Sequence, residues 1–105
     1  MNDTFDFGSG PVPAHRHQNG GGWVADTASV AGTAYVGSNA RVSGNAAVRD
    51  YAAVLGNACV CENAVVYGEA VVCDNARVSD YAFVGGHAIV GGYAVVSDYA
   101  IGSGK

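Results

Sequence analysis

Charged residues are scarce in this chain. Only 13% of its 105 residues are charged, and five basic side chains stand against nine acidic ones. Proteins that bind nucleic acid neutralise its phosphates with a basic patch or stripe, and this sequence offers none. We therefore expect no nucleic-acid partner.

Long apolar runs and paired cysteines are also missing. No apolar run approaches the roughly 18 residues of a membrane-spanning helix, and residues 1–10 lack the basic start and apolar stretch of a secretion signal. The three cysteines are odd in number, and Cys59 and Cys61 form a Cys-x-Cys, which disfavours a disulfide framework and favours a reducing compartment. We expect no membrane partner and a cytoplasmic protein.

Residues that could hold a metal are few. Alternation along an extended strand would put His15 and His17 on one side, but zinc sites usually take three or four protein ligands. Cys59 and Cys61 have no histidine or third cysteine in register with them. We expect no metal site, and the spacing argues against a zinc or nucleophile role for these two cysteines.

The sequence does contain a six-residue repeat, which runs thirteen times from Trp23 to Ile101 without an insertion. One column of the repeat is valine, at Val24, Val30, Val36, Val42, Val48, Val54, Val60, Val66, Val72, Val78, Val84, Val90 and Val96. A second column is alanine, at Ala28, Ala34, Ala40, Ala46, Ala52, Ala58, Ala64, Ala70, Ala76, Ala82, Ala88, Ala94 and Ala100. A fixed period of this length is typical of a parallel β-helix.

Each unit reads Ala, variable, Val, variable and a turn pair, as in residues 40–45. Side chains alternate faces along a strand, so Ala and Val point inward and the variable residues point outward. The first turn place is often Gly or an acid and the second is often Asn, residue types that tolerate positive φ or bond to their own turn. Each unit is thus one short strand and one corner.

Three units close one triangular coil of 18 residues, so the thirteen units make about four coils. We predict an all-β fold, a single-stranded parallel β-helix shaped as a triangular prism over residues 23–101. Residues 1–22 do not follow the period, and we expect them to cap the open end of the solenoid. Residues 102–105 are expected to form a C-terminal tail.

The stretch Gly21-Gly22-Trp23-Val24, followed by Asn-Ala-x-Val units, carries a family resemblance. The repeat resembles the left-handed β-helix of the hexapeptide-repeat superfamily, best known for acyltransferases, over about three quarters of the chain. More narrowly, it is similar to uncharacterised bacterial and phage hexapeptide proteins. The resemblance implies left-handed coils and a homotrimer with ligands in the grooves between adjacent prisms. It also implies the cytoplasm of a bacterial cell or a phage-infected host.

Because residues 18 apart stack, the outward residues sort into faces. One face stacks Ser29, Ala47, Val65, Phe83 and Ile101. The next stacks Tyr35, Ala53, Val71 and Ile89. Apolar ladders on two neighbouring faces usually mark a protein contact, so we expect a homotrimer. Its contacts would be Val65, Phe83, Val71 and Ile89. The alternative explanation of these residues is strand propensity alone.

The third face stacks Trp23, Arg41, Cys59, Arg77 and Val95, and we expect it to be solvated. Arg41 and Arg77 are two coils apart, about 9 to 10 Å, and could bind two phosphates of a small anionic ligand. The alternative is that both arginines are merely solvated.

One edge of the prism gathers acidic, basic and aromatic groups. It stacks Thr33, Tyr51, Glu69 and His87, flanked by Arg49 and Tyr67. Acyltransferases of the superfamily carry a histidine at a subunit groove as general base, and the resemblance implies this role for His87. However, His87 also occupies an ordinary second turn place, which needs no catalysis.

The repeat contains none of the helix-breaking loops that those transferases generally carry. We therefore expect a non-catalytic homotrimeric β-helix, a binding or structural module of phage type. It would need no cofactor and would hold a small anionic metabolite or nucleotide in its subunit grooves. The alternative is an acyl-CoA-dependent acyltransferase with His87 as general base.

Overall fold

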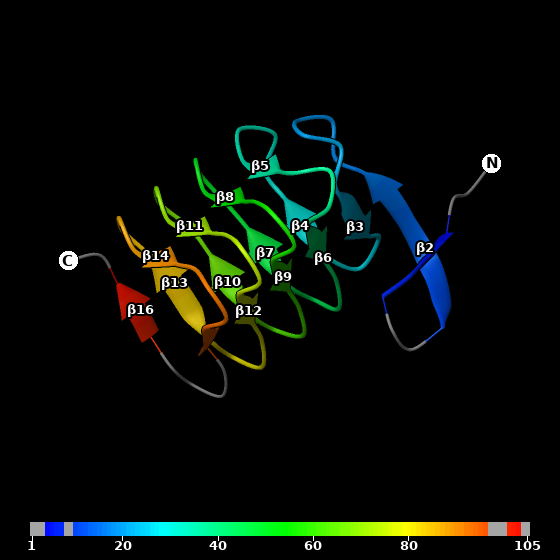
Figure 1. Ribbon diagram of the computed structural model, residues 1–105. Helices are drawn as coiled ribbons and strands as arrows, with labels where there is room; N and C mark the ends of the chain where they lie inside the picture. Colours follow the sequence, from blue (N-terminus) through cyan, green and yellow to red (C-terminus); the bar gives the residue numbers. More distant parts are fainter. Residues whose placement is uncertain (1–3, 8–9, 97–100, 104–105) are drawn as a thin grey trace.

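The chain winds into a three-sided helix of short parallel strands (Figure 1). The computed structural model describes residues 4–7 and 10–96, and the backbone of residues 101–103. Within these residues sixteen strands form three sheets, and no helix occurs. Apart from β1 and β2, the strands of one sheet come from successive coils, so each sheet makes one side of the prism.

The first sheet has the order β1-β2-β3-β6-β9-β12-β15. Its strands are Thr4–Asp6 (β1), Pro11–Arg16 (β2), Trp23–Ala25 (β3), Arg41–Val42 (β6), Cys59–Val60 (β9), Arg77–Val78 (β12) and Val95–Val96 (β15). The second sheet comprises Ser29–Val30 (β4), Ala47–Val48 (β7), Val65–Val66 (β10), Phe83–Gly85 (β13) and Ile101–Ser103 (β16). The third sheet comprises Tyr35–Val36 (β5), Ala53–Val54 (β8), Val71–Val72 (β11) and Ile89–Val90 (β14).

Successive coils are in register over 18 residues. In the first sheet Val24 pairs with Val42, and Val42 pairs with Val60. The backbone ladder continues through the corners, where, for example, the Asn57 N–H donates to the Asp74 carbonyl at 2.8 Å. The fold class predicted from the sequence, an all-β left-handed parallel β-helix of about four coils, is confirmed.

The two repeat columns form the core of the prism. Every valine of the column from Val36 to Val84, and every alanine from Ala34 to Ala82, has at most 1% of its surface exposed. Each valine from Val42 to Val78 therefore packs between the valines of the coils above and below it. Toward the ends this packing is incomplete, because Val30 and Val96 are only partly buried.

The corners place a residue in the left-handed backbone region at every sixth position from Gly44 to Gly92. Four of these nine residues are acids rather than glycines, namely Asp50, Glu62, Asp74 and Asp80. The structure differs here from the sequence expectation, since the first turn place takes positive φ and the Asn residues at the second place do not. The carboxylates of Asp50 and Asp74 accept hydrogen bonds from corner N–H groups of the next coil, at 3.0 Å, which favours the acid there.

The segment before the repeat covers strand edges at the start of the helix. β1 and β2 form an antiparallel hairpin, and β2 pairs antiparallel with β3. At β5 the Val36 N–H donates to the Asn19 carbonyl, and the Val36 carbonyl accepts from the Gly22 N–H, both at 3.0 Å. The segment predicted as a cap thus occupies the edges of two of the three sheets.

The described part of the chain ends in β16, which includes Gly102 and Ser103 of the predicted tail. Residues 97–100 and 104–105 lie outside the described residues, as does the side chain of Ile101 in the first apolar ladder. No helix that could cross a lipid bilayer is present among the residues described.

Candidate functional site

The polar edge brings together two of the residues predicted from the sequence. Nδ1 of His87 lies 2.9 Å from Oε1 of Glu69, one coil below it. The side chains of His87 and Glu69 are 78% and 63% exposed, so water screens this pair and it contributes little to stability. The contact does orient the imidazole. Tyr51, in the same stack, projects into solvent with 70% of its surface exposed.

A shallow hollow lies next to this edge, on the face of the second sheet. Arg49, Val65, Tyr67 and Phe83 line it, and its volume is about 230 Å³. Arg49 supplies a guanidinium group, which binds carboxylates or phosphates in a bidentate manner, while the other three side chains supply apolar surface. The hollow is therefore suited to a small anion with an apolar part.

The Tyr67 ring packs against the backbone of Gly85 in the next coil. A Cβ added to Gly85 would lie 2.1 Å from Cζ of Tyr67 and 2.3 Å from Cε2, so the ring lies directly over the Gly85 backbone. Gly85 is buried, and its φ is outside the left-handed region. Space for the ring, rather than backbone conformation, requires glycine at this position.

We predict that Gly85→Ala displaces the Tyr67 ring and lowers the free energy of unfolding by roughly 1–3 kcal/mol, the usual cost of overpacking. Thermal denaturation measures the loss. In the double variant Gly85→Ala/Tyr67→Ala the new methyl group has no ring to meet, so the cost of the glycine substitution should largely disappear. An equal cost with and without Tyr67 would contradict this packing.

The two apolar ladders predicted from stacking lie side by side on β7, β10 and β13 and on β8, β11 and β14. Val65 and Val71 are half-buried by their neighbours. Phe83 is 43% exposed and Ile89 is 74% exposed. A large part of both ladders is thus accessible on this chain.

The third face is less solvated than the sequence predicted. Cys61 and Ser79, which follow Cys59 and Arg77 by two residues and flank this face, are buried. Trp23 is covered by aromatic and cationic neighbours. The Phe5 ring stacks on Trp23 with centroids 5.0 Å apart, and the Arg16 guanidinium lies 4.6 Å from the Trp23 ring centroid. The N-terminal hairpin, which no repeat pattern could place, accounts for this cover.

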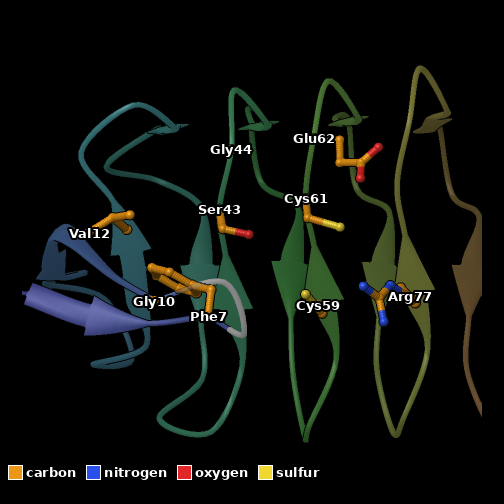
Figure 2. Close-up of a pocket in the computed structure, with 9 residues that line it drawn as sticks. All are labelled: Phe7, Gly10, Val12, Ser43, Gly44, Cys59, Cys61, Glu62 and Arg77. Carbon is orange, nitrogen blue, oxygen red and sulfur yellow. The ribbon is translucent and has the colours of Figure 1, made fainter.

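A second hollow on the third face is shared by the hairpin and the repeat. Its volume is about 260 Å³, and its walls are Phe7, Gly10, Val12, Ser43, Gly44, Cys59, Cys61, Glu62 and Arg77. Figure 2 shows Cys59, Cys61 and Arg77 on successive coils of the repeat, with Phe7, Gly10 and Val12 of the N-terminal segment toward the start of the helix. Arg41 lines a different hollow of about 320 Å³, together with Trp23. The two arginines therefore do not share one cavity.

The three thiols are free, but they differ electrostatically. A hydrogen bond from Cys61 and the charges of Arg77 and Arg41 outweigh burial and lower the pKa of Cys59 from 9.0 to about 7. The hydrogen bond to Cys59 and burial raise the pKa of Cys61. Burial and the Asp74 carboxylate raise the pKa of Cys73. Among the three, Cys59 is the thiol most readily ionised.

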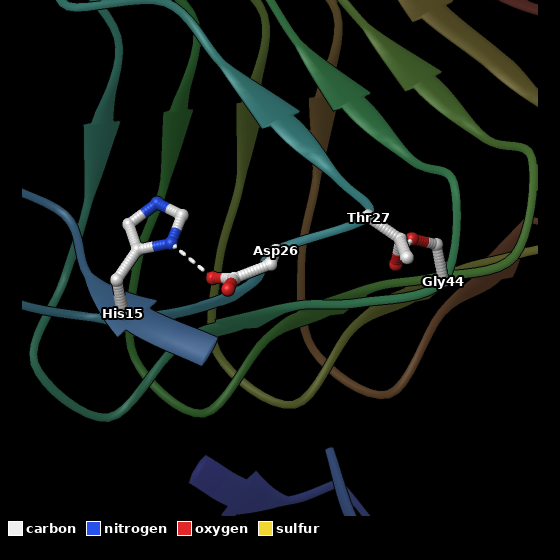
Figure 3. A network of polar contacts seen from close by, with 4 residues as sticks. All are labelled: His15, Asp26, Thr27 and Gly44. Atoms are coloured by element: carbon white, nitrogen blue, oxygen red, sulfur yellow. Dashed lines mark hydrogen bonds and ion pairs between the residues drawn. The ribbon is translucent and has the colours of Figure 1, made fainter. Parts of the chain in front are cut away.

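The two histidines before the repeat do not act together. Nδ1 of His15 lies 2.8 Å from Oδ1 of Asp26, close to the corner where the Thr27 hydroxyl donates to the Gly44 carbonyl (Figure 3). His17 is buried instead, with Nε2 2.9 Å from the Ala34 carbonyl. The expected shared side is wrong because β2 ends at Arg16 and alternation stops there. Nowhere in the described ranges do three potential metal-binding side chains gather.

Comparison of the chain with protein-family models, with curated proteins and with solved structures found no match. The structure thus supports a parallel β-helix on its own geometry.

Proposed function

We propose that this protein is a non-catalytic homotrimeric β-helix, a binding or structural module that holds a small anionic ligand in the grooves between its subunits. The observation that carries the proposal is the position of the Arg49 hollow. It lies on the second sheet beside the first apolar ladder, with Arg49 and Tyr67 at the corners that lead to the third sheet. If two further copies of the chain cover the ladders, a groove forms over the guanidinium.

The ligand chemistry follows from the lining of this hollow. Arg49 is the one charged group among its four lining residues, and Tyr67 and Phe83 offer aromatic surface. An anionic metabolite with a planar or apolar part, such as a nucleotide, would use both features. Glu69 and His87 stand along the same edge and would contact the polar end of such a ligand.

We also infer membership of the hexapeptide-repeat superfamily, near its bacterial and phage representatives. Uninterrupted 18-residue coils with a Val and an Ala column support this inference. The cytoplasm of a bacterial cell or of a phage-infected host is the matching location, because three unpaired cysteines suit a reducing compartment.

A second candidate function, an acyl-CoA-dependent acyltransferase, is favoured by one observation. Glu69 orients the His87 imidazole through Nδ1, as the partner of a general base does. Nε2 would then face the acceptor hydroxyl or amine. The high exposure of both side chains in the single chain is the opposing observation, since general bases work best in sites that exclude water.

One experiment separates the two functions. Native mass spectrometry of the purified protein should detect a small anion bound to trimers, and assays with acyl donors should detect no turnover. Arg49→Gln should weaken binding of that anion roughly ten- to hundredfold, because a charge-assisted hydrogen bond contributes about 1.5–3 kcal/mol. Arg77→Gln makes the same charge change on the third face and should leave this binding intact.

His87→Ala should change at most the affinity for the ligand. Acyl transfer by the wild type that falls roughly 10² to 10⁴-fold in His87→Ala, with the assembly intact, would instead establish the transferase. Equal anion binding by Arg49→Gln and Arg77→Gln would contradict a ligand site in the Arg49 hollow.

A further inference from the structure

Cys59 has surroundings that neither of the other thiols shares. It lies half-buried on β9, and its partners on the adjacent strands are Arg41 on β6 and Arg77 on β12. Adjacent strands are about 4.8 Å apart, so both arginines begin within reach of its sulfur. The thiol of buried Cys61, two residues further on, donates a hydrogen bond to it. Three groups that favour a thiolate thus converge on one sulfur.

The 260 Å³ hollow gives this sulfur access to small molecules. Phe7 and Val12 of the hairpin offer an apolar wall, and Arg77 offers a cation beside the sulfur (Figure 2). Glu62 is the acidic group among the lining residues, and its hydrogen bond with Asp80 raises its pKa. In the sheet itself, the residues that pair with Cys59 on both sides are the cations Arg41 and Arg77.

We propose that Cys59 is a covalent modification site, at which its thiolate exchanges with small disulfides that carry carboxylate groups. The Cys59 sulfur attacks one sulfur of the disulfide RS–SR, a new Cys59–S–S–R bond forms and the original S–S bond breaks. The second RS leaves as a thiolate, which takes a proton from water according to its own pKa. The Cys59 sulfur is oxidised and the departing sulfur is reduced, so the electrons balance.

Cys61 is a positioning residue in this reaction and does not displace R from Cys59. Its raised pKa leaves it protonated at neutral pH. Residues two apart in a strand have Cα atoms about 6.6 Å apart, near the upper limit of about 6.8 Å for a disulfide. The mixed disulfide should therefore persist until an external thiol reduces it. This step lies on the third face and goes beyond the proposed ligand binding.

Cys73 provides a matched internal control. Cys73 is also half-buried, and it directly follows strand β11. Its neighbour is an acid, because Sγ of Cys73 lies 4.0 Å from Oδ2 of Asp74. At pH 7 a thiol with a pKa of about 7 is half ionised, whereas a thiol with a pKa of 9 is only about 1% ionised. The thiolate of the more acidic thiol is less basic, and this reduces its nucleophilicity about eightfold. Cys59 should react roughly five- to tenfold faster on these grounds alone.

The test measures the rate at each cysteine of the intact protein by acid quenching and peptide mass mapping. Three aliphatic disulfides differ in charge: 3,3′-dithiodipropionate is anionic, hydroxyethyl disulfide is neutral and cystamine is cationic. We expect Cys59 to be modified first, with an apparent pKa near 7 in its rate profile and with the anionic probe fastest. One modification per chain should accumulate, and Cys59→Ser should abolish the fast phase.

Variants separate charge recognition from simple exposure. Arg77→Gln should lower the ratio of anionic to neutral rates roughly three- to tenfold, whereas Arg49→Gln, with the same change in net charge, should leave this ratio unchanged. Cys61→Ala should move the rate profile to higher pH, and Cys61→Ser, which retains a donor, should restore part of the shift. A merely structural role of Cys61 would not move the profile.

Three results would overturn the proposal. The first is modification of Cys73 or Cys61 before Cys59 in the wild type. The second is a rate profile at Cys59 with the apparent pKa of an ordinary thiol, near 9. The third is an equal ratio of anionic to neutral rates in Arg77→Gln and the wild type.

Discussion

Val60→Asp should leave the protein unable to fold. Val60 lies in the middle of the valine column of the first sheet, between Val42 in the coil before and Val78 in the coil after, and none of its surface is exposed. A carboxylate there would lose its water and find only methyl groups, at a cost of several kcal/mol. A domain of this size has a total stability of only about 5–15 kcal/mol.

The repeat supplies a matched control for this substitution. Val95 lies on the same sheet but points outward, with 63% of its surface exposed, and it pairs with Arg77. Val95→Asp introduces the same side chain into water beside a cation, so it should leave the far-ultraviolet circular dichroism and the melting temperature nearly unchanged. Soluble Val60→Asp with a native spectrum would show that the column is not the dry core described above.

The core and the strands were predictable because each depends on neighbours that the period itself fixes. A valine at every sixth position brings the same residue above and below it after 18 residues, whatever the corners do. The same 18-residue spacing predicts that Glu69 lies beside His87 and that Arg41 and Arg77 lie beside Cys59. Both stacks are in register in the structure.

Features that the period does not fix could not be predicted. The burial of His17 depends on a contact with Ala34, and the hollow beside Cys59 depends on the hairpin that holds Phe7 and Val12. Both elements lie outside the repeat, so no register relates them to it. Stacking places Tyr67 next to Gly85 but gives no direction for its ring. The missing side chain of Gly85 is the signal that could have indicated this packing.

The corners show a third kind of limit. Composition indicated that Gly, Asp and Asn make the turns, but two adjacent turn places could each take positive φ. In the structure the first place has the positive φ. There the carboxylates of Asp50 and Asp74 accept hydrogen bonds from the N–H groups of Gly68 and Gly92 in the next coil. That choice depends on bonds between coils, whereas turn propensity concerns each turn by itself.

Val71→Asp/Ile89→Asp should convert a trimer into folded monomers. These residues pair on adjacent strands of the third sheet, and both side chains point away from the core. In a single chain the new carboxylates remain in water, so the fold should be retained. In the proposed trimer they would be buried against another copy without a partner, and each would cost several kcal/mol of association free energy.

Sedimentation velocity measures the result directly. The wild type should sediment as a particle of three times the 10.5 kDa chain mass, and the double variant as a single chain with unchanged circular dichroism. Val95→Asp places the same charge on the third face, which the proposed contacts leave free, and should remain trimeric. A double variant that sediments like the wild type would contradict assembly through these ladders, because two unpaired carboxylates side by side on one ladder could not be buried in a stable interface.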